Sequence, residues 1–398
     1  MKILYLLNRL LSSPLEVIYV FLIFIITKDL GATPLQLSIL ACSKPAVSLV
    51  SAFANGFIFG KPKSIKPFLL LCNLIGLLPC LFFPYVENTW FFIASYACFM
   101  TTLRASYPAW IEVLKCKLEI KELSKTVATG SSINYSILIL FPLVFTYFLD
   151  QDPSIWKNLF VCMAILQFLF FLILLVVPLK FNLQDKQEIS GIVSTNVIKE
   201  GWLILRTNSS FVKYQILFFL GGAGVVIVQP ILPIYFNEAL HLSYSQLALA
   251  FSFCRGISFV CSTPFWLAYT QKVSLYSLNA LVNVFSSLFI MFILMAGLGI
   301  EWLLIGYVMY GAMQAGCELS WNLSGPLFSK NKESTPYSCL NLFFVSFRGM
   351  IFPFLGQLIY SWSNAFVLFS LAGGLCLLSV LYALSLNQEY NLEEKTCG

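Results

Sequence analysis

The sequence predicts an all-α membrane protein with twelve transmembrane helices in two pseudo-symmetric six-helix bundles. Its 398 residues are 59% hydrophobic and only 11% charged, whereas a soluble domain carries about 25% charged residues. Apolar stretches of the roughly 20 residues that cross a bilayer as a helix recur along the whole length. Scarce residues also repeat at a fixed spacing in the two halves of the chain.

Twelve apolar segments are the expected spanning helices, and most connections between them are short. The segments cover residues 5–28, 34–59, 66–86, 89–113, 125–149, 155–179, 210–236, 244–270, 273–297, 301–328, 335–360 and 364–386. An extended polar stretch separates the sixth segment from the seventh. It predicts an N-terminal bundle at 1–179, a cytoplasmic central loop at 180–209 and a C-terminal bundle at 210–398.

Lysine and arginine are distributed unevenly between the two sides of the membrane that this order of helices defines. Of 24 such residues, only Lys28 and Lys157 fall on the side opposite the N-terminus and four lie within spans, while the rest, Arg9 among them, fall on the side of the N-terminus. Because cytoplasmic loops are enriched in Lys and Arg, both termini are expected in the cytoplasm, in a chain integral to the cytoplasmic (inner) membrane. The net charge of +6 then reflects topology, and no nucleic-acid partner is expected.

The two halves of the chain align without a gap at a shift of 211 residues, and scarce residue types coincide. The aligned pairs are Lys44 with Arg255, Ser51 with Ser262, Lys61 with Lys272, Trp110 with Trp321, and Pro142 with Pro353. The alignment predicts a duplicated six-helix unit. Parallel six-helix repeats build one large class of transporters, in which the substrate is held near the membrane midplane between the halves.

With six plus six helices, a central polar loop and basic short loops after the second and eighth helices, the chain resembles the major facilitator superfamily. The family's loop between helices 2 and 3 usually reads like G-x-x-x-D-R-x-G-R-R. Here the matching stretch is "GFIFGKPKSIK", which keeps Gly56 and Lys61 but has Gly60 where the family has the acid. The stretch "FFVSFRGMIFPFLGQLIY" is similar to bacterial facilitators without an assigned substrate. The resemblance implies a transporter and names no solute.

Charged side chains inside the spans indicate a functional site, because each costs roughly 2.5–3.5 kcal/mol near the bilayer centre on insertion scales. Some continue polar stripes at helical spacing, such as Lys44 with Ser48, and Glu318 with Gln314 and Asn322. Such stripes favour a wet cavity shared by several helices. The charged residues within the spans are Glu16, Lys44, Arg104, Glu112, Arg255, Glu318 and Arg348.

The charge balance of these residues predicts an anionic substrate. Apart from Glu112, four cations face two acids, and an anionic ligand stabilises unpaired buried cations. The expected substrate-binding residues are Lys44, Arg104, Arg255, Gln314, Asn322 and Arg348. A carboxyl group in a low-dielectric environment takes up a proton more readily, which makes Glu16 and Glu318 the candidates for proton coupling. The predicted function is secondary active transport of a small anionic organic solute by alternating access, with proton coupling left open.

The same residues allow other interpretations. The intramembrane charges are compatible with a purely structural network in which Glu318 pairs with Arg348, and Glu112 with an interfacial ion pair to Lys115. Trp110 and its repeat partner are expected to anchor or pack rather than to stack on substrate. A drug or lipid efflux carrier, or a non-transporting membrane receptor or scaffold of the same fold, stays an alternative function.

Several classes are excluded by motifs that the chain lacks. It has no G-x-x-x-x-G-K-[ST] loop to bind phosphates, which excludes direct use of ATP. Its one histidine, His241, and twelve cysteines without a CxxC pair provide no metal-ligand spacing. Neither enzyme activity nor a cofactor or metal is expected. The expected partners are the solute, membrane lipid and, if transport is coupled, protons, for a carrier that acts as a monomer.

Overall fold

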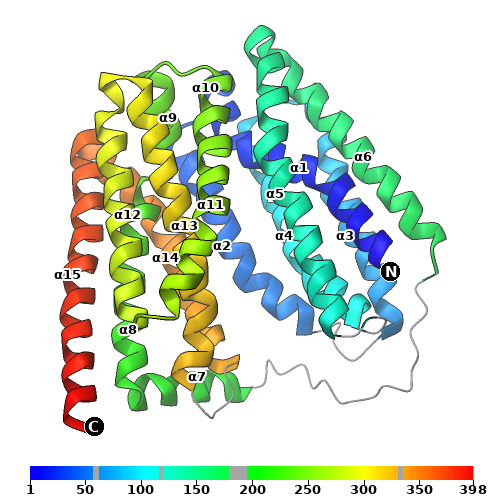
Figure 1. Cartoon of the computed structure of the whole chain (residues 1–398). Coiled ribbons are helices and arrows are strands. Elements are labelled where there is room, and N and C mark those ends of the chain that lie inside the picture. Colours follow the sequence, from blue (N-terminus) through cyan, green and yellow to red (C-terminus); the bar gives the residue numbers. More distant parts are fainter. Residues whose placement is uncertain (57–61, 116–117, 119, 179–194, 330–334, 398) are drawn as a thin grey trace. The chain divides into compact units, whose positions relative to one another are not determined.

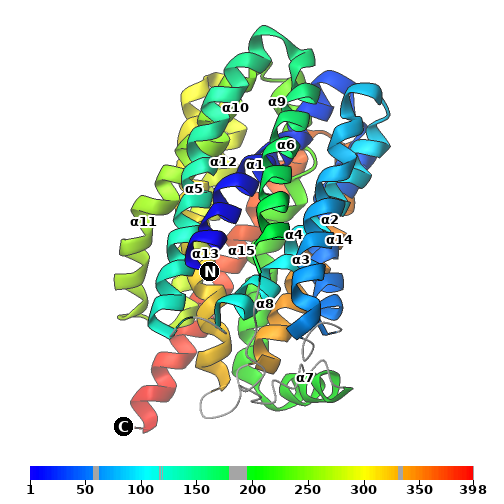
Figure 2. The same cartoon turned by 90° about the vertical axis from the view of Figure 1, so that its right-hand side faces the viewer.

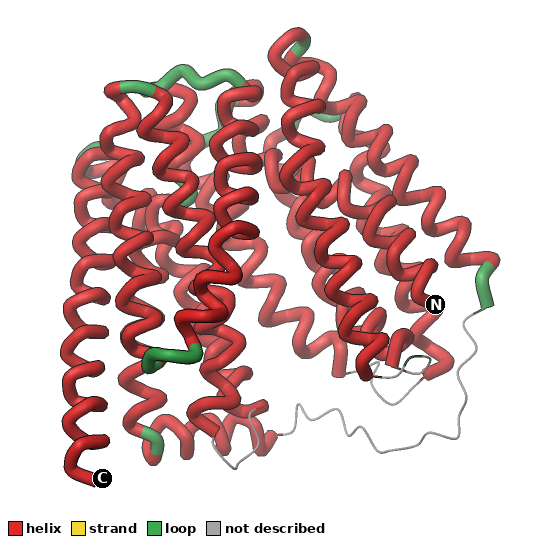
Figure 3. The backbone as a smooth tube through the Cα atoms, in the orientation of Figure 1, coloured by secondary structure: helices red, strands yellow, loops and turns green. Residues whose placement is uncertain are grey.

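The regular elements of the described chain are all helices, as Figure 3 shows. The structure is a computed structural model that describes residues 1–56, 62–115, 118, 120–178, 195–329 and 335–397. These residues form two compact units, one built from residues up to 194 together with Ser243–Ser245, and one from the rest of the chain. Each unit is described by itself.

The first unit contains six long helices, labelled in Figure 1. Its elements are α1 (Lys2–Leu30), α2 (Pro34–Gly56), α3 (Pro62–Leu77), the 3₁₀ helix η1 (Leu78–Tyr85), α4 (Thr89–Lys115), α5 (Ile120–Gln151), the 3₁₀ turn η2 (Pro153–Ile155) and α6 (Trp156–Val176). Helix α1 packs against α5 and α6, while α4 packs against α2 and α3. A core of Tyr5, Trp110 and Phe170 rings joins α1, α4 and α6.

The second unit is built around α8, α12 and α13. Its elements are α7 (Thr195–Thr207), α8 (Ser209–Val228), α9 (Leu232–Glu238), α10 (Tyr244–Ala248), the π-helix η3 (Leu249–Cys254), α11 (Arg255–Thr270), α12 (Leu275–Met295), the 3₁₀ turn η4 (Ala296–Leu298), α13 (Ile300–Ser329), α14 (Thr335–Trp362) and α15 (Ala365–Cys397). Helix α12 packs against α13 and α15, α8 against α14 and α15, and α11 against α13.

Three expected spans contain breaks that hydropathy alone does not locate. The span expected at 210–236 is divided into α8 and α9 near Pro230, where proline lacks the N–H that a helix interior needs. The span at 244–270 contains the π-helix η3, and the span at 66–86 ends as the 3₁₀ helix η1, which contains Pro79 and Pro84. Such interruptions are common at functional hinges and sites.

Part of the expected central loop is a helix. Residues 195–207 form α7, which runs crosswise to the long helices of the second unit in Figures 1 and 2. Gly201 brings α7 against Leu340 of α14, while Trp202 and Leu203 are exposed. Because residues 180–209 are polar in composition, the short amphipathic helix α7 was not predicted from the sequence.

Nine helical segments of the described chain are long and apolar enough to cross a membrane, so the protein is integral to a membrane. Helices α2, α4 and α13 cover three further expected spans and are 23, 27 and 30 residues long. They are not among the nine, and they carry Lys44, Arg104 and Glu318.

Glycines in α8 permit close helix packing. A Cβ atom at Gly221 would overlap the Asn283 side chain, and one at Gly224 would overlap the backbone oxygen of Ala372 in α15. The glycine cluster of this helix therefore lets α12 and α15 approach its backbone.

Candidate functional site

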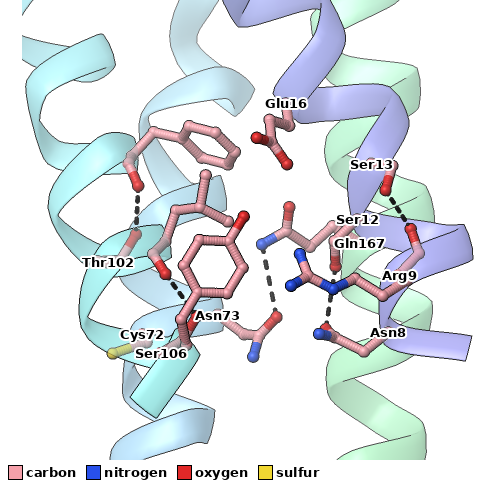
Figure 4. Close-up of a pocket in the computed structure, with 13 residues that line it drawn as sticks. Asn8, Arg9, Ser12, Ser13, Glu16, Cys72, Asn73, Thr102, Ser106 and Gln167 are labelled. Atoms are coloured by element: carbon pink, nitrogen blue, oxygen red, sulfur yellow. Dashed lines mark hydrogen bonds between the residues drawn. The ribbon is translucent and has the colours of Figure 1, made fainter. Parts of the chain in front are cut away.

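Helix α1 turns a polar face into the interior of the first unit. Residues 8, 9, 12, 13 and 16 lie on one side of a helix because they follow steps of one and three. The Ser12 hydroxyl donates to Asn8 Oδ1 at 3.2 Å, and the Ser13 hydroxyl donates to the backbone oxygen of Arg9. Figure 4 shows these side chains together with Glu16 along one edge of a cavity. The polar face was overlooked in the sequence because it lies within a long apolar run.

The cavity lies between α1, α3, α4 and α6 and encloses about 460 Å³ of empty space, part of which is open. Besides the α1 residues, the polar side chains at its wall are Asn73, Thr102, Ser106, Tyr107 and Gln167. The Gln167 amide donates from Nε2 to Asn73 Oδ1 at 3.5 Å, and Asn73 Nδ2 donates to the Leu69 carbonyl at 2.8 Å. The wall is therefore formed mainly by neutral hydrogen-bonding groups around one acid and one arginine.

Glu16 is the half-buried carboxylate of this cavity. Three cations interact with it electrostatically: Lys44 on α2, Arg9 on α1 and Arg104 on α4. Three residues expected at a functional site, Glu16, Lys44 and Arg104, are thus brought together by three helices of one unit. The surrounding positive charge exceeds the single negative charge.

Arg9 is a member of this cluster that charge counting assigned to the cytoplasmic edge. Its Nε donates to Tyr5 Oη at 3.2 Å, and its guanidinium lies 4.4 Å from the centre of the Tyr107 ring. Gly130 of α5 makes room for this arrangement, because a Cβ there would meet the Tyr5 ring and the Arg9 side chain. The seven-residue spacing of Arg9 and Glu16 is the signal that could have placed both on one face.

Arg255 is the first residue of α11 and follows the π-helix η3. Its guanidinium lies 4.6 Å from the ring centre of Phe251 and 5.5 Å from that of Tyr310. Gly311 of α13 allows this approach, since a Cβ there would overlap the backbone oxygen of Arg255. Rings on both η3 and α13 therefore fix the cation, while its N–H groups have no acceptor among the described residues.

Arg348 is held in a different way. Its Nη1 donates to the backbone oxygens of Phe218 at 2.6 Å and Phe219 at 3.3 Å, and its side chain is only 6% exposed. A Cβ at Gly222 would overlap the guanidinium, so this glycine is what admits Arg348 to α8. Arg348, expected to contact substrate, therefore donates in this structure to the backbone of a neighbouring helix.

The expected polar stripe of α13 is divided by burial. Glu318 and Asn322 are exposed on the surface of the second unit, Gln314 is half-buried, and the glycines at 311 and 325 are buried. The pairing of Glu318 with Arg348 that the sequence allowed is not formed between these two described residues. An exposed acid within a span is costly in lipid, so this face requires a polar environment.

A chain of buried amides stabilises the contact of α14 with α8 and α13. Asn341 Nδ2 donates to Ser324 Oγ at 3.0 Å, and Gln215 Nε2 donates to Asn341 Oδ1 at 3.4 Å. The face shared by Asn341 and Arg348 is thus packed against neighbouring helices. Hydrogen bonds of this kind hold helices together in membranes.

The repeated tryptophans both pack within their own units. Trp110 is 2% exposed and lies 5.9 Å from the Tyr5 ring, whereas Trp321 is half-buried with its ring 6.2 Å from that of Phe218. Their positions support packing rather than substrate stacking. The side chains of Glu112 and Lys115 lie outside the described residues.

The described part of the chain contains no group of three His, Cys, Asp or Glu side chains that could hold a metal ion. The sequence matches the profile of the Major Facilitator Superfamily over residues 5–346. The chain belongs to this family, and it is a transporter, not an enzyme.

Solved structures with the same fold are transporters of several kinds. They include the nucleoside transporter NupG (TM-score 0.72, 13% identity, covering 96% of this chain and 98% of that one). A POT family transporter in complex with 5-aminolevulinic acid is similar over 97% and 95% of the two chains, with TM-score 0.71 and 13% identity. A D-xylose–proton symporter is similar over 96% of each chain, with TM-score 0.66 and 14% identity. At these identities the likeness establishes the fold, and no curated protein matches the sequence.

Proposed function

We propose that this transporter carries a small organic anion across the cytoplasmic (inner) membrane by alternating access, in symport with protons. The proposal includes twelve spans, in six-helix bundles at 1–179 and 210–398 joined by a cytoplasmic loop at 180–209. It also places both termini in the cytoplasm and treats the carrier as a monomer in lipid. The substrate-binding residues proposed are Lys44, Arg104, Arg255, Gln314 and Asn322.

The single observation that supports an anionic substrate best is the state of Arg255. Its guanidinium lies near the rings of Phe251 and Tyr310, and its N–H groups have no acceptor among the described residues. A planar guanidinium held against aromatic rings offers paired donors that match a carboxylate or phosphate. An anion at this edge would complete the hydrogen bonds that the surrounding side chains leave open.

Arg348 is given a packing role in this proposal. Its Nη1 donates to two backbone oxygens of α8, and helix carbonyls are partners that stabilise a buried cation in a membrane. Arg255 and Arg348, both expected to bind substrate, therefore differ in their contacts: those of Arg348 join α14 to α8, whereas the guanidinium of Arg255 has no backbone or side-chain acceptor among the described residues.

The balance of charges around Glu16 supports the coupling of transport to protons. The carboxylate and an anionic solute would compete for the same cations, Lys44 and Arg104. A proton taken up by Glu16 removes the competing negative charge, so binding of one anion favours uptake of one proton. The exposed acid Glu318 is the other candidate for proton coupling, and the variants Glu16→Gln and Glu318→Gln distinguish the two.

Counterflow of radiolabelled anionic metabolites in proteoliposomes tests the substrate class. Loss of one charge-assisted pair, about 1.5–3 kcal/mol, should weaken anion binding at least about tenfold in Arg255→Gln, with partial recovery in Arg255→Lys. Lys272→Gln, which removes a cation at the end of α11, is the matched control and should leave counterflow unchanged.

Two outcomes would overturn the anionic class. One is anion counterflow in Arg255→Gln equal to that of the unaltered protein. The other is thermal stabilisation of the purified protein by lipophilic cations but not by anions, which would favour an efflux carrier. A ligand at 100 times its dissociation constant stabilises by about 2.7 kcal/mol, so a thermal-shift screen detects the second outcome.

A further inference from the structure

We propose that the polar cavity inside the first unit is a hydrated path along which protons reach Glu16, with Gln167 and Asn73 holding the water. The inference rests on Glu16 as the coupling acid of the proposed function and adds the route by which that acid exchanges its proton. It concerns the space between α1, α3, α4 and α6, within a single unit.

The size and polarity of the cavity favour water. It leaves about 30 Å³ for the centres of water-sized molecules, while one water needs roughly 10–15 Å³ by this measure. Cavities of this size stay dry when their walls are apolar and hold water when polar groups line them. Here hydroxyl and amide groups of Ser12, Asn73 and Gln167 form the wall.

An unpaired buried acceptor gives the second, independent indication. The Gln167 side chain is 5% exposed, and its Oε1 has no hydrogen-bond donor among the described groups. Figure 4 shows its amide pointing into the same space as the Glu16 carboxylate. A buried carbonyl oxygen without a donor loses roughly 1–3 kcal/mol, and a water in the cavity would remove this penalty while donating onward to its neighbours.

The side chains around Glu16 favour a proton as the ion that moves through this cavity. The charged and titratable side chains that interact with Glu16 are Arg9 on α1, Lys44 on α2, and Arg104, Tyr96 and Tyr107 on α4. Cys72 of α3 also lines the cavity, while α6 contributes the neutral Gln167. The fixed charge of Arg9 disfavours a resident metal cation.

The proton transfer itself is simple. Serine hydroxyls and amides both donate and accept hydrogen bonds, so a short file of water between them can pass a proton in either direction. The terminal water transfers its proton to a Glu16 carboxylate oxygen, an O–H bond forms there, and the file regains a proton from solution. No other reactant takes part.

Hydroxyl-radical footprinting of the full chain by X-rays tests the hydration without any transport measurement. Radicals that form from bound water label the side chains it touches, and the labelled residues are found by mass spectrometry. Cys72 should be labelled several times faster than Cys42, which is equally exposed at 7% but does not line the cavity. Equal labelling of the two cysteines would overturn the proposal.

Transport variants test the path. Gln167→Leu should slow proton uptake into proteoliposomes by an order of magnitude, while substrate counterflow, which needs no net proton movement, stays unchanged. Thr146→Val, which removes a buried hydroxyl bonded to the Pro142 carbonyl outside the cavity, is the control.

The outcomes separate the two proposals. If Gln167→Leu lowers the labelling of Cys72 but takes up protons at the normal rate, the cavity holds water that protons do not use. That result would overturn the proposed path. Fast labelling of Cys72 in a protein that moves no protons would overturn the proposed symport but leave the hydration standing.

Discussion

The first unit gathers charged side chains around a cavity, whereas the charged residues of the second unit that were expected at a functional site each have separate surroundings. In the first, Glu16 interacts with three cations from three helices. In the second, Arg255 lies near two aromatic rings, Arg348 donates to helix carbonyls, and Glu318 is exposed on α13. A cluster of interacting charges can respond to a proton or an anion, whereas an arginine that donates to the backbone oxygens of a neighbouring helix stabilises one arrangement of helices.

The largest difference expected between the units is the effect of removing an acid on the coupling of transport to protons. Glu16→Gln should abolish accumulation of substrate against its gradient under a proton gradient, because no carboxylate is left to accept the proton among Lys44 and Arg104. Exchange of substrate for substrate should persist in this variant. Uphill uptake and counterflow in proteoliposomes measure the two properties separately.

Glu318→Gln is the matched variant of the second unit. It should retain uphill uptake, since the carboxylate of Glu16, which interacts with Lys44 and Arg104, is unchanged in this variant. If Glu318→Gln loses accumulation and Glu16→Gln keeps it, coupling belongs to the second unit and the comparison is reversed.

The repeated tryptophans are expected to differ in stability rather than in transport. Trp110→Ala removes a side chain that is 2% exposed, and truncation of a buried Trp costs roughly 3–5 kcal/mol. Trp321→Ala should cost clearly less, because the ring of Trp321 is only half-buried. Reversible unfolding in detergent compares them, and equal losses would contradict the difference in packing.

Gly222→Ala tests whether Arg348 is a packing residue. The new methyl group would overlap the guanidinium, and overpacking of this kind destabilises by about 1–3 kcal/mol. The thermal midpoint should therefore fall. Gly374→Ala is the control, because a Cβ at Gly374 meets nothing within 4 Å and alanine favours the helix. A lowered midpoint in the control alone would contradict the packing role.

The smallest effects are expected from two ion pairs on the surface, one in each unit. Lys2 Nζ lies 2.7 Å from Glu122 Oε1, and Lys213 pairs with Glu389, with all four side chains well exposed. Exposed pairs contribute about 0–1 kcal/mol. Glu122→Gln and Glu389→Gln should each shift the thermal midpoint little and alike, and a large shift in one would show that the pair joins helices more tightly than its exposure implies.

Much of the architecture could be read from the sequence because hydropathy and charge act over whole segments. Among the described residues, helical elements occupy most of each expected segment, although Pro230 and η3 divide two of them. The helix α7 was not predicted, since polar residues dominate its surroundings in sequence. A helix break depends on one or two residues, and these contribute little to a hydropathy average over about twenty residues.

The candidate site was predictable in part. The cost of a charge in lipid pointed to Glu16, Lys44 and Arg104 before their proximity was known. Arg9 was placed at the membrane edge, and Gln167 was not noticed, because an isolated amide in an apolar helix has no distinctive pattern. Their roles depend on neighbours from α3 and α4, far along the chain.

The sequence by itself determined that this protein is a helical membrane carrier with charged side chains in its spans, because lipid admits few other solutions to an apolar chain of this length. Only the tertiary structure decided which of those charges interact. Arg255 and Arg348 are the same residue type in two apolar helices, yet the guanidinium of Arg255 lies near two aromatic rings and that of Arg348 donates through Nη1 to two carbonyls. The difference arises from the residues opposite each arginine, Tyr310 for one and Gly222 for the other, and helix packing brings those residues into place.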